Sequence, residues 1–360
     1  MRIRVAVLTV ALAAIVVGAL PVLAAADLTA ALDYLQAQQN ADGGFGSGFS
    51  PGSTLASTPI VVLAIVAAGG DPAAFDQDGN TPITYMEANA ASATSAGDLS
   101  KLILAAIAVG ENPRSLGGVD SVVKLENLSD AGGRIGGEAD TFIGHTLAVL
   151  ALASAQRPIP AAAVEVITDS QQENGSWAWD GSAETAGDTN TTAFAVQALV
   201  AAGEDPGSEA ITDALAYYQG IQNEDGGWPY QNPSDYGTAT DANSTAVTIQ
   251  ALIAAGQDPT GADWTQDGGG TPVAALEALQ NPSGALAWQA AVPDDNLLAT
   301  VQALPALAGK AFPFATMDVG QAVAPVTVPE TGGGAVALAL PLLLSGLALA
   351  GGGYLLNRKK

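Results

Sequence analysis

Acidic, amide and hydroxyl side chains recur at the starts of helical segments, and they are the residues best placed to do chemistry. Two such groups share one spacing. Their members are Asp188, Asn190, Thr191, Asp241, Asn243 and Ser244. The N-termini of helices favour anions and polar ligands, and carboxylates can act as general acids. The pattern therefore allows polar ligand binding or acid catalysis.

A third group lies before a later helical segment and consists of Asp294, Asp295 and Asn296, while the single histidine, His145, lies near the start of an earlier one. Asp294, Asp295 and His145 are candidate catalytic residues, and His145, Asp295 and Asn296 are also candidate ligand-binding residues. A simpler role is open to each, because Asp and Asn commonly cap helices and a lone His at a helix start is more often a packing residue. Spacing alone reveals no Ser-His-Asp order.

The sequence contains few of the residues that bind transition metals. A zinc site needs three or four sulfur or nitrogen ligands, and a chain without cysteine and with one histidine does not supply them. Calcium is a candidate at oxygen-rich stretches such as residues 223–226 and 294–296, although neither has the spacing of a complete calcium loop. We therefore predict no cofactor, with calcium as the alternative.

The helical segments form repeats. Loops with the pattern Gln-x5-Trp separate the two helices of the clearest units, and their members are Gln171, Trp177, Gln222, Gly227 and Trp228. Proline stop signals end the units at Pro72, Pro113, Pro158, Pro206, Pro259 and Pro313. A period of roughly 40 to 55 residues indicates a repeat architecture, here six helix pairs across residues 27–312. Either an open solenoid or a closed ring satisfies this period.

The Gln-x5-Trp pattern resembles the Gln-Trp motif of squalene-hopene cyclases. The set of six pairs is similar to the α/α-toroid repeat family, which also includes protein prenyltransferases and cobalamin carriers. This resemblance implies an all-α fold, an α/α toroid in which the first helix of each pair is outer and the second is inner. It also implies that the Gln-Trp loop ties neighbouring pairs together.

The resemblance implies two activities that can be compared with the residues. Prenyltransferases of the family hold zinc with an Asp-x-Cys pair, and the matching positions Asn190 and Asn243 carry no thiol. Squalene-type cyclases use an Asp-x-Asp-Asp acid, and Asp294-Asp295 lacks the leading Asp. We therefore expect non-catalytic binding of a small molecule or peptide in the toroid cavity. The alternative is a terpene-cyclase-like enzyme that uses Asp294 and Asp295 as acids.

The two ends of the chain have the patterns of an exported, anchored protein. Residues 1–26 read as a signal peptide, 313–334 as a spacer, 335–356 as a transmembrane helix and 357–360 as a basic cytoplasmic tail. In the spacer, Val328-Pro329-Glu330-Thr331-Gly332 resembles the Leu-Pro-x-Thr-Gly sortase signal, with Val328 in place of Leu. We expect a cell-surface protein held by the membrane helix or, after cleavage between Thr331 and Gly332, by the cell wall.

The charge balance limits the partners. The chain carries 36 acidic and 11 basic residues, for a net charge of −25. Such a surface repels nucleic acid and anionic lipid. We therefore expect no nucleic-acid partner.

Overall fold

The computed structural model describes residues 26–320, except for 49, 137–139 and 236. Nearly all of the predicted signal peptide, most of the spacer with Pro329, Thr331 and Gly332, the predicted transmembrane helix and the basic tail lie outside the described residues. Within the described part of the chain, none of the helices has both the length and the apolar character needed to cross a membrane.

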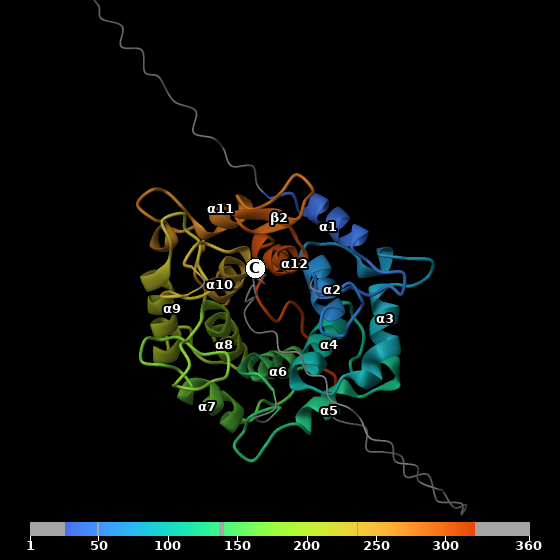
Figure 1. The fold of residues 1–360 in the computed structure, drawn as a ribbon. Helices are drawn as coiled ribbons and strands as arrows, with labels where there is room; N and C mark the ends of the chain where they lie inside the picture. The colour runs from blue at the N-terminus through green and yellow to red at the C-terminus, as the bar shows by residue number, and fades with distance from the viewer. Residues whose placement is uncertain (1–25, 49, 137–139, 236, 321–360) are drawn as a thin grey trace, which may run out of the picture.

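The described helices form two concentric rings (Figure 1). The inner helices are α2 (Thr58–Ala67), α4 (Ala96–Ala108), α6 (Phe142–Ser154), α8 (Thr189–Ala201), α10 (Ala242–Ala254) and α12 (Leu297–Leu307). The outer helices are α1 (Leu28–Ala37), α3 (Pro82–Asn89), α5 (Ser121–Glu126), α7 (Ala161–Asp169), α9 (Glu209–Ile221) and α11 (Pro272–Glu277). Short 3₁₀ helices lie at Pro72–Ala74, Ala90–Ser92, Leu116–Gly118 and Ala262–Trp264.

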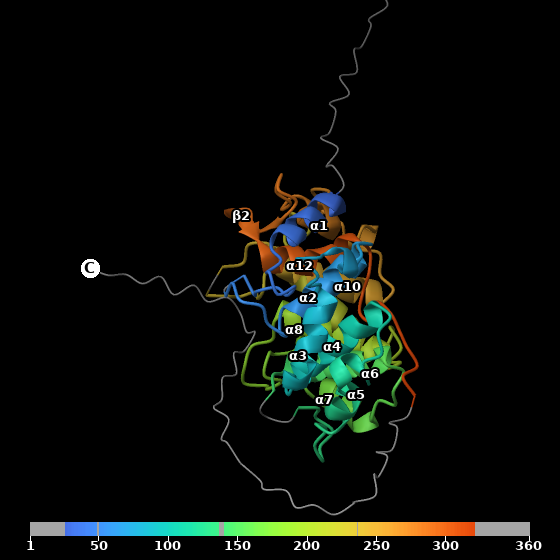
Figure 2. The same cartoon turned by 90° about the vertical axis from the view of Figure 1, so that its right-hand side faces the viewer.

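Each inner helix packs against the next, and α12 packs against α2, so the ring is closed. The prediction of an α/α toroid with outer first helices and inner second helices is thereby confirmed. Figure 2, turned by 90°, shows the inner helices stacked side by side within the body. The choice between solenoid and ring, which the repeat period left open, is decided in favour of the ring.

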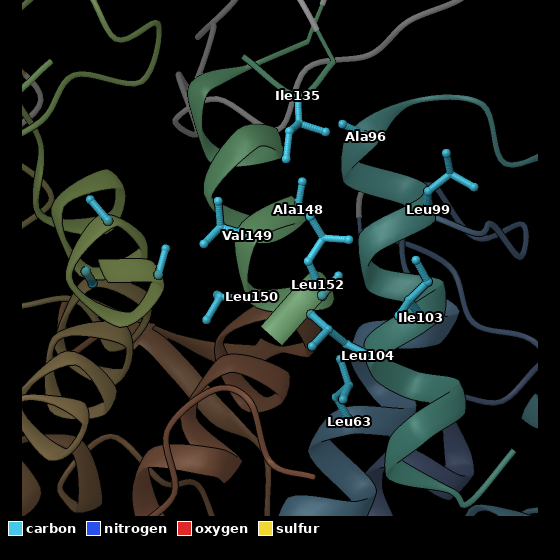
Figure 3. Close-up of a cluster of buried hydrophobic side chains, with 14 of the residues drawn as sticks. Leu63, Ala96, Leu99, Ile103, Leu104, Ile135, Ala148, Val149, Leu150 and Leu152 are labelled. Carbon is cyan, nitrogen blue, oxygen red and sulfur yellow. The ribbon is translucent and has the colours of Figure 1, made fainter. Parts of the chain in front are cut away.

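Most residues of the inner helices are buried. In α2, for example, Val61, Val62, Leu63 and Ile65 are all buried, as expected for a helix enclosed by other helices. Side chains of neighbouring inner helices interdigitate in the core, where Ile103 and Leu104 of α4 lie close to Leu152 of α6 (Figure 3). Neighbouring inner helices are therefore joined by a shared apolar core.

The two Gln-Trp loops join the fourth and fifth units to the unit that follows each of them. The side-chain amide of Gln222 donates to the carbonyls of Gly226 and Trp264, at 2.8 and 3.0 Å. Gln171 makes the corresponding bonds to Gly175 and Ala210, at 2.9 and 2.8 Å. These bonds fix the loop and hold it against the following unit.

The rings of Trp177 and Trp228 are fully buried below these loops. The indole of Trp177 donates to the Ile167 carbonyl at 2.7 Å, and that of Trp228 donates to the Tyr218 carbonyl at 2.9 Å. Gly227 allows a close approach, because a Cβ on this residue would lie 2.3 Å from the Thr240 side chain. The motif residues are thus structural ties in this fold.

One element departs from the all-α expectation. Strands β1 (Leu286–Gln289) and β2 (Val292–Asn296) form an antiparallel hairpin, with Leu286 opposite Asn296. The sequence predicted that Asp294 and Asp295 would open a helix, but both belong to β2 and only Asn296 caps α12. Asp295 pairs with Ala287 of β1, so the strand continues to Asn296 and the helix begins only after it.

Candidate functional site at the rim of the ring

The N-terminal turns of the inner helices lie side by side at one end of the ring, which we call the rim. The Ala96 amide of α4 donates to Asp140, beside the start of α6, at 3.2 Å. The Asn243 amide of α10 donates to Gln302 of α12 at 2.5 Å. These bonds between neighbouring helices bring the polar residues predicted as candidates to one end of the molecule.

The opposite end of the inner ring is covered by residues 310–320. Lys310 donates to the Val66 carbonyl at 3.3 Å, and the Phe312 amide donates to Gln197 at 2.9 Å. The Ser154 hydroxyl donates to the Ala315 carbonyl at 2.7 Å. Residues 313–320, predicted as the beginning of the spacer, therefore lie against the toroid.

Asp188 and Asp241 cap α8 and α10 in the same way. One carboxylate oxygen of Asp188 accepts from the Thr191 amide at 2.8 Å, and the other accepts from the Thr191 hydroxyl at 2.7 Å. Asp241 makes both bonds with Ser244, at 2.8 and 2.9 Å. Thr191 and Ser244 are therefore partners of these two carboxylates, and the shared spacing of the two groups has a local structural cause.

Burial gives these two carboxyl groups unusual acidity. Asp188 is 1% exposed and Asp241 is 2% exposed. Burial raises the pKa of each to about 6, although the hydrogen bonds from Thr191 and Ser244 act in the opposite direction. Tyr230 lies between the two helix ends, where its carbonyl accepts from the Thr189 amide at 2.9 Å. The rim thus contains buried acids, but both carboxylates are occupied by contacts within the chain.

His145 is fully buried and serves as a tie between a loop and a helix. Its Nδ1 accepts from the Ile135 amide at 3.0 Å, and its Nε2 lies 2.9 Å from the Ala163 carbonyl, so Nε2 carries the proton. Burial lowers the pKa of His145 to about 4. In four other repeats a threonine hydroxyl at the equivalent position accepts from the loop amide in the same way: Thr58 from Phe45, Thr192 from Trp177, Thr245 from Trp228 and Thr300 from Leu286.

The two rim asparagines differ in their contacts. Asn243 is bonded to Gln302, as described above, whereas the side-chain oxygen of Asn190 is buried without a partner in the described part of the structure. Both side chains are half-buried. Gln302, which the sequence did not single out, therefore belongs to the polar set at the rim.

Asp294 and Asp295 lie on the exposed side of the hairpin. Asp295 accepts from the Asn281 amide and the Ser283 hydroxyl, both at 2.8 Å. In the fifth repeat the corresponding bond runs in the other direction, from the Thr240 hydroxyl to Asp225 at 2.7 Å. In the fifth repeat the carboxylate lies in the loop and the hydroxyl before the inner helix, and in the last repeat these positions are reversed. Asp295 therefore holds the loop in place, as Thr240 does in the fifth repeat.

A hollow of about 210 Å³ opens where the last repeat meets the first, and we call it the seam hollow. It is lined by Tyr34, Gln38, Ser47, Gly48, Asp295, Asn296, Leu297 and Leu298. The structure thus brings the predicted residues Asp295 and Asn296 together with Tyr34 of α1 and with Gln38, which follows α1 directly. Burial, and then the charge of Asp295, raises the pKa of Tyr34.

The sequence did not indicate Tyr34 and Gln38 as site residues, because they lie on and directly after the first outer helix, whereas Asp295 lies in the last repeat. Ring closure alone makes them neighbours. A second, larger hollow of about 490 Å³ lies on the outer face, where it is bordered by α9 and carries the acidic residues Glu173, Glu204, Glu209 and Asp213. In the part of the chain that the structure describes, no group of three or more His, Cys, Asp or Glu side chains is arranged to hold a metal ion.

Residues 121–290 match the model of the squalene-hopene cyclase C-terminal domain. The match covers 170 of the 360 residues, and over this part the chain is similar to the cyclases of the α/α-toroid repeat family. The toroid resembles the type II terpene cyclase MstE from Scytonema, with 14% identity, a TM-score of 0.54, and coverage of 78% of this chain and 96% of the cyclase. It also resembles a protein from Actinoplanes, with 14% identity, a TM-score of 0.57, and coverage of 78% and 98%. At such identities the likeness is one of fold. A search of curated proteins gave no match.

Proposed function

We propose that this toroid is a non-catalytic binding protein displayed outside the cell, and that its rim holds a small molecule or a peptide. The observation that carries the proposal is the seam hollow, where Asp295, Asn296 and Tyr34 line one accessible space. The lining combines a carboxylate, amides, an aromatic ring and two leucines. Such a mixture suits a ligand that presents both hydrogen-bonding groups and an apolar face.

The state of the buried acids supports binding over catalysis. A general acid must direct its proton toward the reacting group. Both oxygens of Asp188 and of Asp241 already accept hydrogen bonds from the first turn of their own helices. Turning either carboxyl toward a substrate would break a helix cap. These acids therefore contribute to the stability of the rim.

The alternative is a terpene-cyclase-like enzyme, and the fold supports it as well as it supports binding. MstE has been solved with geranylgeranyl dihydroxybenzoate as its substrate. In this chain the acids proposed for such a reaction, Asp294 and Asp295, lie exposed on β2. A terpene cation needs an enclosing apolar chamber, which an exposed strand does not provide, so the position of these two acids favours binding over cyclisation.

Display at the cell surface is the second part of the proposal. It is supported by the sequence patterns of residues 1–26 and 335–356 and by the sortase-like stretch that ends in Thr331-Gly332. Cell fractionation tests it. Recovery of the chain in the membrane or cell-wall fraction is expected, and recovery of the intact chain in the cytoplasm would contradict it.

Binding is tested with the full chain against glycans, peptides, corrinoids, Ca²⁺ and geranylgeranyl dihydroxybenzoate, by thermal shift and then calorimetry. A ligand of the seam hollow should bind at least about tenfold more weakly to Asp295→Asn and to Tyr34→Phe, since each change removes a polar contact. Asp225→Asn is the matched control, because it alters the equivalent loop tie outside the hollow. Equal weakening by all three variants would count against the seam hollow.

The cyclase alternative has its own test. The chain is incubated with geranylgeranyl dihydroxybenzoate, and isomeric products are separated by chromatography, because cyclisation does not change the mass. Unchanged substrate is expected. A cyclised product that disappears in the Asp294→Asn/Asp295→Asn variant would establish the enzyme and overturn the binding proposal.

A further inference from the structure

The closing seam of the ring contacts the residues at which the predicted signal peptide ends. The Ala26 amide donates to the Glu277 carboxylate at 3.3 Å, and the Asp27 amide donates to the Gln280 side-chain oxygen at 2.8 Å. Glu277 is the last residue of α11, which precedes α1 around the outer ring (Figure 1). A carboxylate and an amide oxygen therefore face two successive backbone nitrogens.

We propose that Glu277 and Gln280 form a binding site for the chain's own α-ammonium group, which is created when residues 1–26 are removed. This inference rests on the proposed export of the chain. Hydrolysis breaks the peptide bond between Ala26 and Asp27: the Ala26 carbonyl carbon gains the hydroxyl of water, and the Asp27 nitrogen gains a proton. An α-amino group has a pKa of about 7.7–8.0, so the new terminus takes up a second proton at neutral pH.

The site is better matched to the processed terminus than to the continuous chain. Before cleavage the Asp27 nitrogen has one N–H, which Gln280 accepts. After cleavage it has three, so it keeps the Gln280 bond and offers the others to Glu277, which has lost its Ala26 partner. Hydrogen bonds between two charged groups are stronger than those between neutral ones.

Two carboxylates at the start of α1 favour a positively charged terminus at Asp27. A positive terminus at a helix N-terminus is unfavourable, because the helix dipole is positive there. The Asp27 carboxylate, which accepts from the Ala30 amide at 2.9 Å, and the nearby Glu277 carboxylate offset this repulsion. Asp27 therefore suits the first position of the mature chain.

The structure also sets the limit beyond which processing must not go. The Asp27 carbonyl accepts from the Gln280 amide at 2.9 Å, and its side chain caps α1. Cleavage one residue later would remove the cap and both bonds to Gln280. The small residues Ala24, Ala25 and Ala26 directly precede this limit, as a signal-peptidase site requires.

The first experiment exports the full chain and determines its N-terminus by mass spectrometry. Asp27 is the expected first residue, and a mature chain that begins at Leu28 or later would overturn the inference. In the same protein, the α-amine is acylated with an amine-reactive ester at pH 7. Glu277→Gln should speed this acylation about two- to fivefold, the range expected for loss of a half-exposed ion pair. The control Glu165→Gln, on α7, should leave the rate unchanged.

A second preparation separates this inference from the proposed export. Residues 20–26 of the full chain are replaced by the recognition sequence of a site-specific protease that leaves Asp27 as the first residue after digestion. Faster acylation in Glu277→Gln than in the parent chain supports the site even if export fails. Equal rates in this preparation would overturn the site, whatever the cell does with residues 1–26.

Discussion

The side-chain amide of Gln280 makes two hydrogen bonds with the main chain of Asp27, at 2.8 and 2.9 Å, across 253 residues of sequence. The same amide also donates to its own loop at Gly284. Gln222 and Gln171 likewise hold their own loops and the following unit. The same kind of glutamine bond joins one repeat to the next, and Gln280 makes it between the last repeat and the first. This bond closes the ring.

Gln280→Ala should loosen the ring at the seam. The change removes the two bonds that the Gln280 side-chain amide donates to Asp27 and Gly284, and the one that its oxygen accepts from the Asp27 amide. We therefore expect the free energy of unfolding to fall by about 1–3 kcal/mol. Hydrogen exchange should become faster in α1, which is held on one side by Gln280. Gln222→Ala is the control, because it cuts the equivalent tie inside the ring. Equal exchange in α1 for both variants would contradict a special role for the seam.

Gly284→Ala should destabilise the same seam by a different route. Gly284 has φ +86°, and a Cβ on it would lie 2.2 Å from the Ala30 carbonyl. We expect a loss of about 2–4 kcal/mol from strain and clash. Gly220→Ala is the matched control in α9, where the added methyl group meets nothing within 4 Å. That change should stabilise the protein slightly, by about 0.5 kcal/mol. Denaturant titration measures both.

Asp188 and Asp241 should make the protein less stable as the pH rises through about 6. Their folded pKa of about 6 exceeds the ordinary value of 3.8, so the folded state binds more protons between these values. The stabilisation is complete below pH 3.8 and is lost above 6, by about 3 kcal/mol for each group. Asn keeps the ability to cap a helix.

The comparison is therefore between the parent chain and the Asp188→Asn/Asp241→Asn variant at a series of pH values. The free energy of unfolding of the variant, relative to the parent, should increase from pH 4 to pH 7. Using this difference cancels the contribution of the other carboxyl groups. A difference that stays constant with pH would show that neither buried acid has a raised pKa.

His145 should have the opposite dependence on pH. Its folded pKa of about 4 lies below the ordinary value of 6.5, so the unfolded state binds the proton first. The stabilisation is present above pH 6.5 and is lost as the pH falls through about 4, by roughly 3 kcal/mol. His145→Thr introduces the residue found at the equivalent position in other repeats.

The His145→Thr variant should therefore lose less stability than the parent chain between pH 6.5 and pH 4. At pH 7 it should be less stable by about 1–3 kcal/mol, because the bond to Ala163 and part of the packing are lost. Urea unfolding at the two pH values provides the measurement. Parallel behaviour of variant and parent would mean that His145 is not held neutral by burial.

Local spacing in the sequence was enough to predict the six helix pairs and the Gln-Trp loops, whereas their order as outer and inner came from the resemblance to the α/α-toroid repeat family. The spacing also placed Asp188 and Asp241 at the starts of inner helices. These features follow from interactions between residues a few positions apart, such as Asp241 with Ser244. Such short-range interactions can be predicted from the order of the residues alone.

The tertiary structure decided what the sequence left open. Closure depends on Gln280 meeting Asp27, and the seam hollow depends on α1 lying beside β2. The role of His145 became clear only when Ile135 and Ala163 were found at its two ring nitrogens. The physical reason is that burial and hydrogen-bond partners come from segments distant in the chain, and these determine whether a polar side chain caps a helix, ties a loop or faces a ligand.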